Sequence, residues 1–221
     1  MMTNLFSIFD PSSSLLSAPL YWVSLLLIMM ILPNSLWLIG PQGNKAPLTL
    51  SMVLFNEMKI IVKSKGFKII LLTLFMIIMT NNTLGLAPYV FTPTSHMLIT
   101  LSLSLPLWLA IVMQGWTKKF NHMMTHLVPQ GTPGPLMPFM VCIETISNTI
   151  RPATLAVRLA ANMIAGHLLL TILSEQSNKN PTSVLPALFL SQIALLTLET
   201  AVAIIQAYVF TILSALYISE V

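Results

Sequence analysis

The fold is decided by the stretch at residues 185–221, which reads LPALFLSQIALLTLETAVAIIQAYVFTILSALYISEV. This stretch contains no Lys or Arg, and its acidic residues are Glu199 and Glu220. A continuous helix of this length extends roughly 55 Å, whereas the hydrocarbon core of a bilayer is about 30 Å thick. Such a long apolar helix cannot stand upright in a membrane, so we predict a membrane helix that is strongly tilted.

The composition of the whole chain agrees with a membrane protein. Of the 221 residues, 56% are hydrophobic and only 7% are charged, which is too few to cover a globular core in water. The net charge of +4 comes mainly from lysines in short connections, a pattern typical of membrane topology and not of nucleic-acid binding. The single cysteine, Cys142, excludes a disulfide within the chain.

Four other segments are expected to form membrane helices: residues 15–32, 67–86, 97–116 and 139–173. Residues 48–67, where lysines alternate with apolar side chains, predict an interfacial amphipathic helix. The segment 139–173 is also longer than one crossing needs. We therefore expect it to form a hairpin with 185–221 around the polar turn 174–183.

The expected fold class is an all-α integral membrane protein with about five membrane helices, the last two long and strongly tilted as a hairpin. We find no internal repeat and expect one membrane domain over residues 1–221. Within it, residues 1–138 would supply the peripheral and upright helices, and residues 139–221 would supply the long hairpin.

The distribution of lysines predicts the orientation, because cationic connections stay on the side of synthesis. One side carries Lys45, Lys59, Lys63, Lys65, Lys68, Lys118 and Lys119. The opposite side carries only Lys179, so we expect the amino terminus outside and the carboxyl terminus inside. The 15 Met and near absence of Asp are typical of proteins made inside animal mitochondria, and the start of the chain resembles neither a secretory signal nor a transit peptide.

Ionisable groups inside membrane helices are costly, so each is a functional candidate. Apart from Glu220 at the end of the chain, the last two apolar segments contain five: Glu144, Arg151, Arg158, His167 and Glu199. At about 100° per residue, Glu144, Arg158 and Asn162 project from one face of their helix. His167 lies nine positions after Arg158 and points to the opposite side, roughly 13 Å further along.

The final segment carries a second polar stripe, because Gln192, Glu199 and Gln206 recur every seven residues. Glu199 can take up and release protons, whereas Arg158 keeps its proton at physiological pH and can only attract a carboxylate. Two polar stripes that meet inside lipid predict a proton path.

Each of these residues also has a structural explanation. Arg158 and Glu199 could belong to buried ion pairs, His167 could be a hydrogen-bonded core residue, and Glu144 could complement a helix dipole. His122 and His126 have the spacing of metal ligands on one helical face, but neighbouring prolines and the lack of a third ligand argue against a metal or haem site. The sequence also lacks a phosphate-binding glycine loop, so no cofactor is expected.

The segments that carry these residues resemble a known family. The sequences are PQGTP at 129–133, ETIS from Glu144, RPATLAVRLAANMIAGH at 151–167 and ETAVAIIQAYVF at 199–210. Together they closely resemble the a subunits, also called subunit 6, of mitochondrial F-type ATP synthases. The resemblance is specific over about residues 127–217 and looser in the amino-terminal half.

The resemblance implies a proton-translocating stator beside a rotating ring of small hairpin subunits, with two half-channels that open to opposite sides of the membrane. Arg158 matches the arginine that attracts the ring carboxylate and blocks a leak between the half-channels. The other proton-path residues would be His167 and Glu199 on the intermembrane-space side, Glu144 on the matrix side, and Asn162 and Gln206 beside the arginine. The chain would conduct protons without being catalytic alone.

The same resemblance places the chain in the mitochondrial inner membrane, with its amino terminus in the intermembrane space and its carboxyl terminus in the matrix. The implied partners are the ring, other membrane subunits, the peripheral stalk and lipid, with no nucleic acid.

Two other classes of protein remain as alternatives. A secondary transporter would bind a solute between paired repeats, and the absence of a repeat argues against this class. A structural membrane subunit would use its charges as buried ion pairs that fix helix register. Substitution of Glu199 separates these classes, because loss of stability without selective loss of proton flux would favour a structural role.

Overall fold

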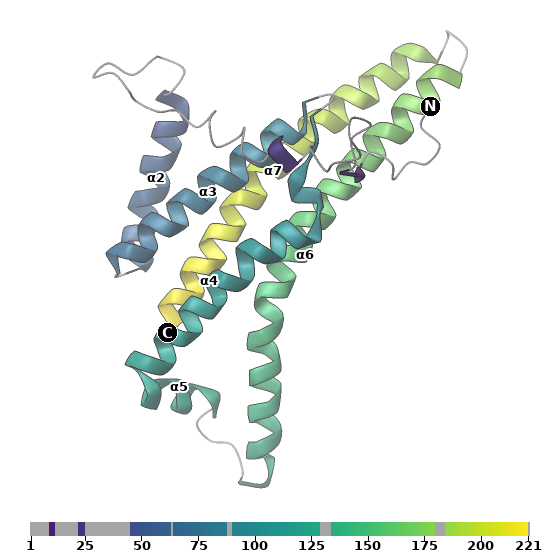
Figure 1. Ribbon diagram of the computed structural model, residues 1–221. Coiled ribbons are helices and arrows are strands. Elements are labelled where there is room, and N and C mark those ends of the chain that lie inside the picture. The colour runs from purple at the N-terminus through teal and green to yellow at the C-terminus, as the bar shows by residue number, and fades with distance from the viewer. Residues whose placement is uncertain are drawn as a thin grey trace.

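The computed structural model describes residues 9–11, 22–24, 45–62, 64–87, 90–128, 134–179 and 184–220. The regular elements of these residues are all helical. They are α2 (Lys45–Ile61), α3 (Lys65–Gly85), the 3-10 turn η4 (Pro93–Ser95), α4 (Met97–Lys118), α5 (Phe120–Leu127), the 3-10 turn η5 (Gly134–Leu136), α6 (Met137–Lys179) and α7 (Leu185–Glu220). Figure 1 shows their arrangement.

Four of the described helices are long and apolar enough to cross a membrane, namely α3, α4, α6 and α7. The all-α membrane fold predicted from the sequence is therefore confirmed in this part of the chain. The first expected membrane helix, residues 15–32, lies outside the described residues except for 22–24.

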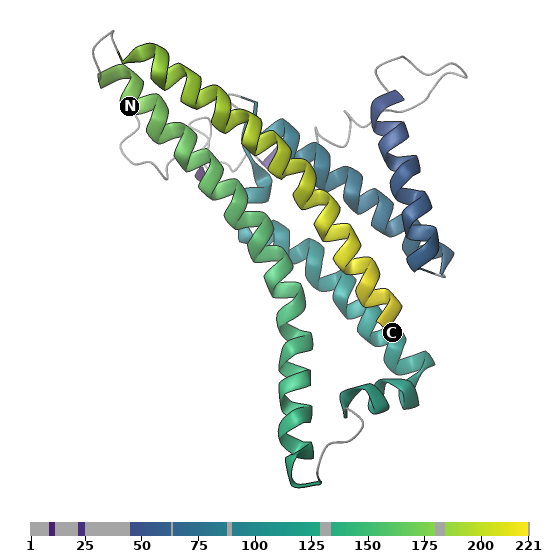
Figure 2. The ribbon, with the colours of Figure 1, turned by 180° about the vertical axis from the view of Figure 1, so that it is seen from behind.

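The two longest helices form the expected hairpin. α6 has 43 residues and α7 has 36, and the two run antiparallel and side by side from the turn that joins them (Figures 1 and 2). The polar turn predicted at 174–183 was too long, because α6 continues to Lys179. Residues 174–179 contain no Gly or Pro, and polar side chains alone do not end a helix, whereas Pro181 follows soon after.

α6 is bent, and its first part diverges from α7 (Figures 1 and 2). Pro152 lies inside α6 and is buried. A proline within a helix removes one backbone hydrogen bond and its ring presses on the preceding turn, which kinks the helix. We attribute the bend to Pro152.

The core lies between the hairpin and the two shorter membrane helices. α3 packs mainly against α7, and α4 packs mainly against α6. The buried apolar side chains of this core include Leu71, Phe75, Ile78, Leu155, Leu159, Ala207, Phe210 and Ala215. Large apolar side chains also remain exposed on the outer faces of α3, α4, α6 and α7, as expected where lipid is the solvent.

Two boundaries differ from those predicted. The amphipathic helix expected at 48–67 ends at Ile61, and α3 begins at Lys65 after Ser64, a residue type that favours the position before a helix. Within the loop expected at 121–138, Phe120–Leu127 forms the short helix α5. No proline or glycine interrupts this segment, because the first such residue after it is Pro129.

Candidate functional site

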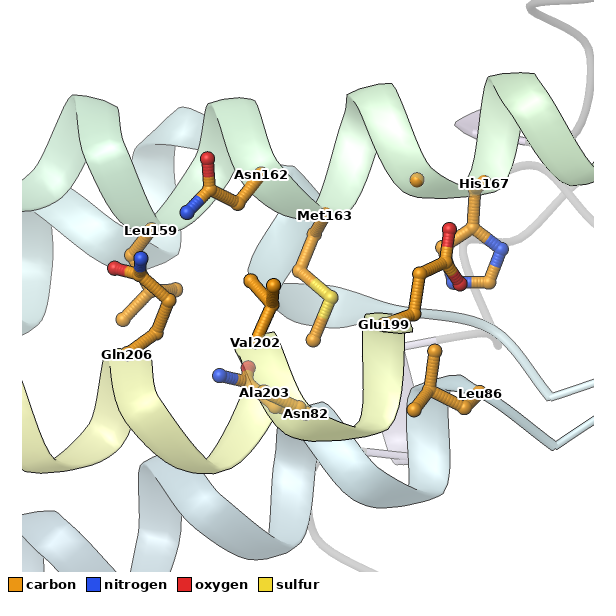
Figure 3. A pocket seen from close by; sticks show the side chains of 11 residues that line it. Asn82, Leu86, Leu159, Asn162, Met163, His167, Glu199, Val202, Ala203 and Gln206 are labelled. Atoms are coloured by element: carbon orange, nitrogen blue, oxygen red, sulfur yellow. The ribbon is translucent and has the colours of Figure 1, made fainter. Parts of the chain in front are cut away.

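A small cavity, lined by both polar and apolar side chains, lies between α6, α7 and the carboxyl end of α3. Its volume is about 20 Å³, enough for a single water molecule. The lining residues are Asn82, Leu86, Leu159, Asn162, Met163, Gly166, His167, Glu199, Val202, Ala203 and Gln206. Four residues that the sequence selected for a proton path, Asn162, His167, Glu199 and Gln206, therefore share one cavity (Figure 3).

Glu199 is the acidic group of this cavity. Its side chain is only 8% exposed, and both carboxylate oxygens are buried without a hydrogen-bond partner among the described residues. Burying an ionised carboxylate without a partner is very costly, so the group needs a proton or a polar ligand there. These properties suit a site that binds and releases a proton.

Space for Glu199 comes from Gly166 on the facing helix. A Cβ atom built on Gly166 would lie 2.7 Å from the carboxyl carbon of Glu199 and would overlap its Oε1. Only a residue without a side chain allows the carboxylate to approach the α6 backbone in this way. The contact between Gly166 and Glu199 thus sets the position of the carboxylate between α6 and α7.

His167 is half-buried at the same cavity. Its ring is hydrogen-bonded to the backbone of Gly85 at the end of α3, and the ring of Phe9 packs edge-on against it at 6.5 Å between centroids. Its Nε2 is buried and has no hydrogen-bond partner among the described residues. The imidazole is therefore held in place while one nitrogen stays open to a water or a proton.

A second, smaller space lies next to this cavity and includes Arg158 in its lining. It is lined by Leu155, Arg158, Leu159, Gln206, Val209 and Phe210, and it has no room for a water molecule. Gln206 and Leu159 line both spaces, and Figure 3 shows Asn162 and Gln206 approaching each other from α6 and α7. This second space therefore offers no room for a water molecule between Gln206 and Arg158.

Arg158 itself is exposed on the surface of the chain, as are Ala161 and Ala165 on the same face of α6. An arginine inside a membrane helix almost always faces a protein partner or a water-filled space and not lipid. Small neighbouring residues let another helix approach closely. This face of α6 is thus suited to a partner.

Glu144 does not join this group. It is half-buried on the part of α6 before Pro152, lines neither of the two spaces, and precedes Arg158 by 14 residues, roughly 21 Å along a helix. Gln192, the outer member of the predicted stripe on α7, is also half-buried.

The side chains of His122 and His126 lie outside those described, and no group of three potential metal ligands occurs in the described part of the chain.

Sequence reasoning did not select Asn82, Gly166 or Phe9 for the site. Asn82 is 1% exposed and its Oδ1 is buried without a described partner. In the sequence, Asn82 stands out only as one of two adjacent amides near the end of an apolar helix. The fold is needed to show that its side chain faces the cavity. Gly166 and Phe9 had no local signal, since their importance depends on Glu199 and His167.

Comparison with known proteins identifies the family. The profile described as ATP synthase A chain matches residues 18–219. This chain belongs to the F-type ATP synthase subunit a family. Curated relatives named ATP synthase subunit a include those of Locusta migratoria, 52% identical over 224 residues, and Anopheles gambiae, 52% identical over 225 residues.

The relative from Drosophila melanogaster is also 52% identical, over 224 residues. In each of these comparisons the match covers 100% of both chains. The resemblance to F-type ATP synthase subunit a inferred from the sequence is confirmed, and the chain is a membrane-sector subunit of a multi-subunit complex.

Proposed function

We propose that this subunit provides two half-channels that load and unload protons on the carboxylates of a rotating ring. One half-channel includes His167 and Glu199, and Glu144 lies on the other. Arg158 stands between them and faces the ring. Proton flow through the two half-channels would turn the ring and so drive ATP synthesis elsewhere in the complex.

The observation that carries this proposal is the exposure of Arg158 on a membrane helix. A guanidinium cannot release its proton, so Arg158 cannot relay protons itself. It can attract a carboxylate that arrives from a partner and favour the ionised form of that carboxylate. The exposed alanines of the same face leave space for the partner helix that brings it.

The lack of room for a water molecule in the space beside Arg158 supports the separation of the half-channels. A proton at the Glu199 cavity would have no water through which to bypass the arginine. It would have to transfer to the ring and travel with it. The energy available is about 2.3 kcal/mol for each charge that crosses 100 mV, so several protons are needed for each nucleotide.

The location proposed for this function is the mitochondrial inner membrane. The lysines at the connections support an amino terminus in the intermembrane space and a carboxyl terminus in the matrix. Partners would be the ring, other membrane subunits and the peripheral stalk. The chain would not be catalytic by itself.

The test replaces Arg158 by Ala and measures ATP-driven and passive proton flux in membranes that contain the assembled complex. We expect ATP-driven pumping to disappear and a passive leak to appear, because nothing then separates the two half-channels. Assembly is checked by the intact complex on a native gel. Persistence of pumping would show that Arg158 is structural and that the proposed path is wrong.

Arg151→Gln is the matched control. Arg151 lies two turns before Arg158 in α6, but its guanidinium carbon lies over the ring of Tyr217 in α7, 5.0 Å from the centroid. We expect this variant to lower stability without opening a passive leak. A leak in both variants would mean that any lost charge in α6 disturbs the membrane sector.

A further inference from the structure

A larger cavity lies at the other end of the membrane helices. Its volume is about 290 Å³, and it is partly open and bordered by the end of α2, the start of α3 and the ends of α4 and α7. The Glu199 cavity includes Asn82 near the end of α3, whereas this one includes Phe67 near its start. The two are therefore separated by roughly 20 Å along that helix. We call it the basic-end cavity.

The lining of the basic-end cavity is divided by polarity. One part is apolar and includes Ile61, Phe67, Ile111 and Ile218. The other part carries Ser64, Gln114, Lys118 and Lys119, and no acidic residue is among the described residues that line it. A ligand that satisfies both parts must combine an apolar body with an anionic or strongly polar head.

Ser64 supplies an independent sign that the cavity suits a polar ligand. Its hydroxyl oxygen is buried and has no hydrogen-bond partner among the described residues. Ser64 precedes α3 as its N-cap residue, yet it makes no capping bond, and the first turn of α3 has no acidic residue. An anion beside Ser64 could accept hydrogen bonds from this hydroxyl and from uncapped amides of the first turn.

The position of the lysines indicates that the cavity lies at the level of the lipid head groups. Lys118 is the last residue of α4, a helix long and apolar enough to cross a membrane, and Lys119 follows it. Both side chains are exposed. Lysines at the end of a membrane helix reach toward lipid head groups, and basic pockets between membrane helices bind anionic ones.

We propose that the basic-end cavity binds an anionic phospholipid from the leaflet on the lysine-rich side of the membrane. The phosphate group contacts Lys118, Lys119 and Ser64, and the upper part of an acyl chain packs against Phe67 and Ile218. A free phosphate ion would leave the apolar part of the cavity without a contact. The site shares no lining residue with the Glu199 cavity, so it does not depend on the proton path.

The experiment uses the assembled complex in nanodiscs of phosphatidylcholine, with a phosphatidylglycerol probe that carries a photoreactive group in its acyl chain. Labelled peptides are mapped by mass spectrometry. We expect saturable labelling within residues 61–67 and 111–119. Excess unlabelled phosphatidylglycerol should compete, whereas phosphatidylcholine and inorganic phosphate should not.

Substitution of both lysines, K118Q/K119Q, should raise the half-saturating probe concentration roughly 30-fold, about fivefold for each lysine. K118R/K119R should restore labelling, because it keeps both charges. Lys59→Gln is the control, since Lys59 lies over the ring of Phe55 in α2 and does not line the cavity. If the K118Q/K119Q variant does not assemble, competition by the different lipids in the unmodified complex still tests whether the cavity selects an anionic head group.

Three results would overturn the proposal. Equal labelling by a phosphatidylcholine probe would show an apolar crevice without head-group selectivity. Competition by inorganic phosphate would show a site for a soluble anion. Cross-linking of these peptides to another subunit, with no lipid labelling, would show that a protein fills the cavity.

Discussion

Gly166 on α6 and Glu199 on α7 lie so close together that a single added carbon would displace the acid. A Cβ atom on Gly166 would stand 2.7 Å from the carboxyl carbon of Glu199, well inside van der Waals contact. Gly66 at the start of α3 has nothing within 4 Å of the equivalent position. A side chain at position 166 would therefore force the end of the Glu199 side chain to shift, whereas one at position 66 would meet open space.

Replacing Gly166 by Ala should move Glu199 out of its place between the helices. We expect proton-driven ATP synthesis to fall by roughly ten- to a hundredfold, and overpacking to cost about 1 to 3 kcal/mol of stability. Gly66→Ala should leave synthesis unchanged and should stabilise α3 by less than the roughly 0.5 to 1 kcal/mol typical of a mid-helix glycine, because Gly66 lies in the first turn. Equal rates of synthesis in the two variants would contradict the steric role of Gly166.

Glu199→Gln tests whether the acid serves transport or stability. The amide has nearly the same shape but cannot bind and release a proton, so ATP-driven proton flux should fall at least about tenfold. The unfolding temperature of the complex should not fall, because the carboxylate oxygens have no described hydrogen-bond partner to lose. Glu175→Gln, at an exposed site near the end of α6, is the control. Lower stability with normal flux would favour the structural alternative.

Asn82→Leu tests whether the amide at the end of α3 belongs to the proton path. The leucine has the same branching and number of heavy atoms but cannot bind the water for which the cavity has room, so proton flux should decrease several-fold. Asn81→Leu is the matched control, because the Nδ2 of Asn81 donates to the carbonyl oxygen of Ile77 at 2.8 Å. That variant should lose about 1 kcal/mol of stability and keep its flux. The opposite pattern would assign the transport role to Asn81.

Tyr217 and Arg151 offer a test of how the hairpin is held together. Tyr217→Phe keeps the ring under the guanidinium and should change the unfolding temperature little, whereas Tyr217→Ala removes the ring and should lower it. A double-mutant cycle with Arg151→Gln should give a coupling energy of about 0.5 to 2 kcal/mol. A coupling energy near zero would mean that the contact contributes nothing to packing.

The sequence predicted the long helices well, because apolar length is a local property that lipid converts directly into structure. It also predicted the inward stripe on α7, where Glu199 is buried and Gln192 and Gln206 are half-buried. The end of α6 was missed because residues 174–179 are polar without being helix breakers.

The composition of the site was only partly predictable. Heptad spacing and intramembrane charge pointed to residues that later proved to share a cavity. The contributions of Gly166 and Asn82 could not be found in this way, because each depends on a helix far away in sequence. The exposure of Arg158 was also hidden, since spacing gives the relative direction of two residues and not which of them faces the core.

The exposed position of Arg158 has a consequence for the biogenesis of the subunit. In a newly inserted copy that has not met its partners, this guanidinium would face hydrocarbon, at a cost of roughly 2.5 to 3.5 kcal/mol on insertion scales. A partner that covered this guanidinium on assembly would remove that cost and so favour the complex over the orphan chain. An orphan copy would thus differ from an assembled one by an intramembrane charge that no protein covers.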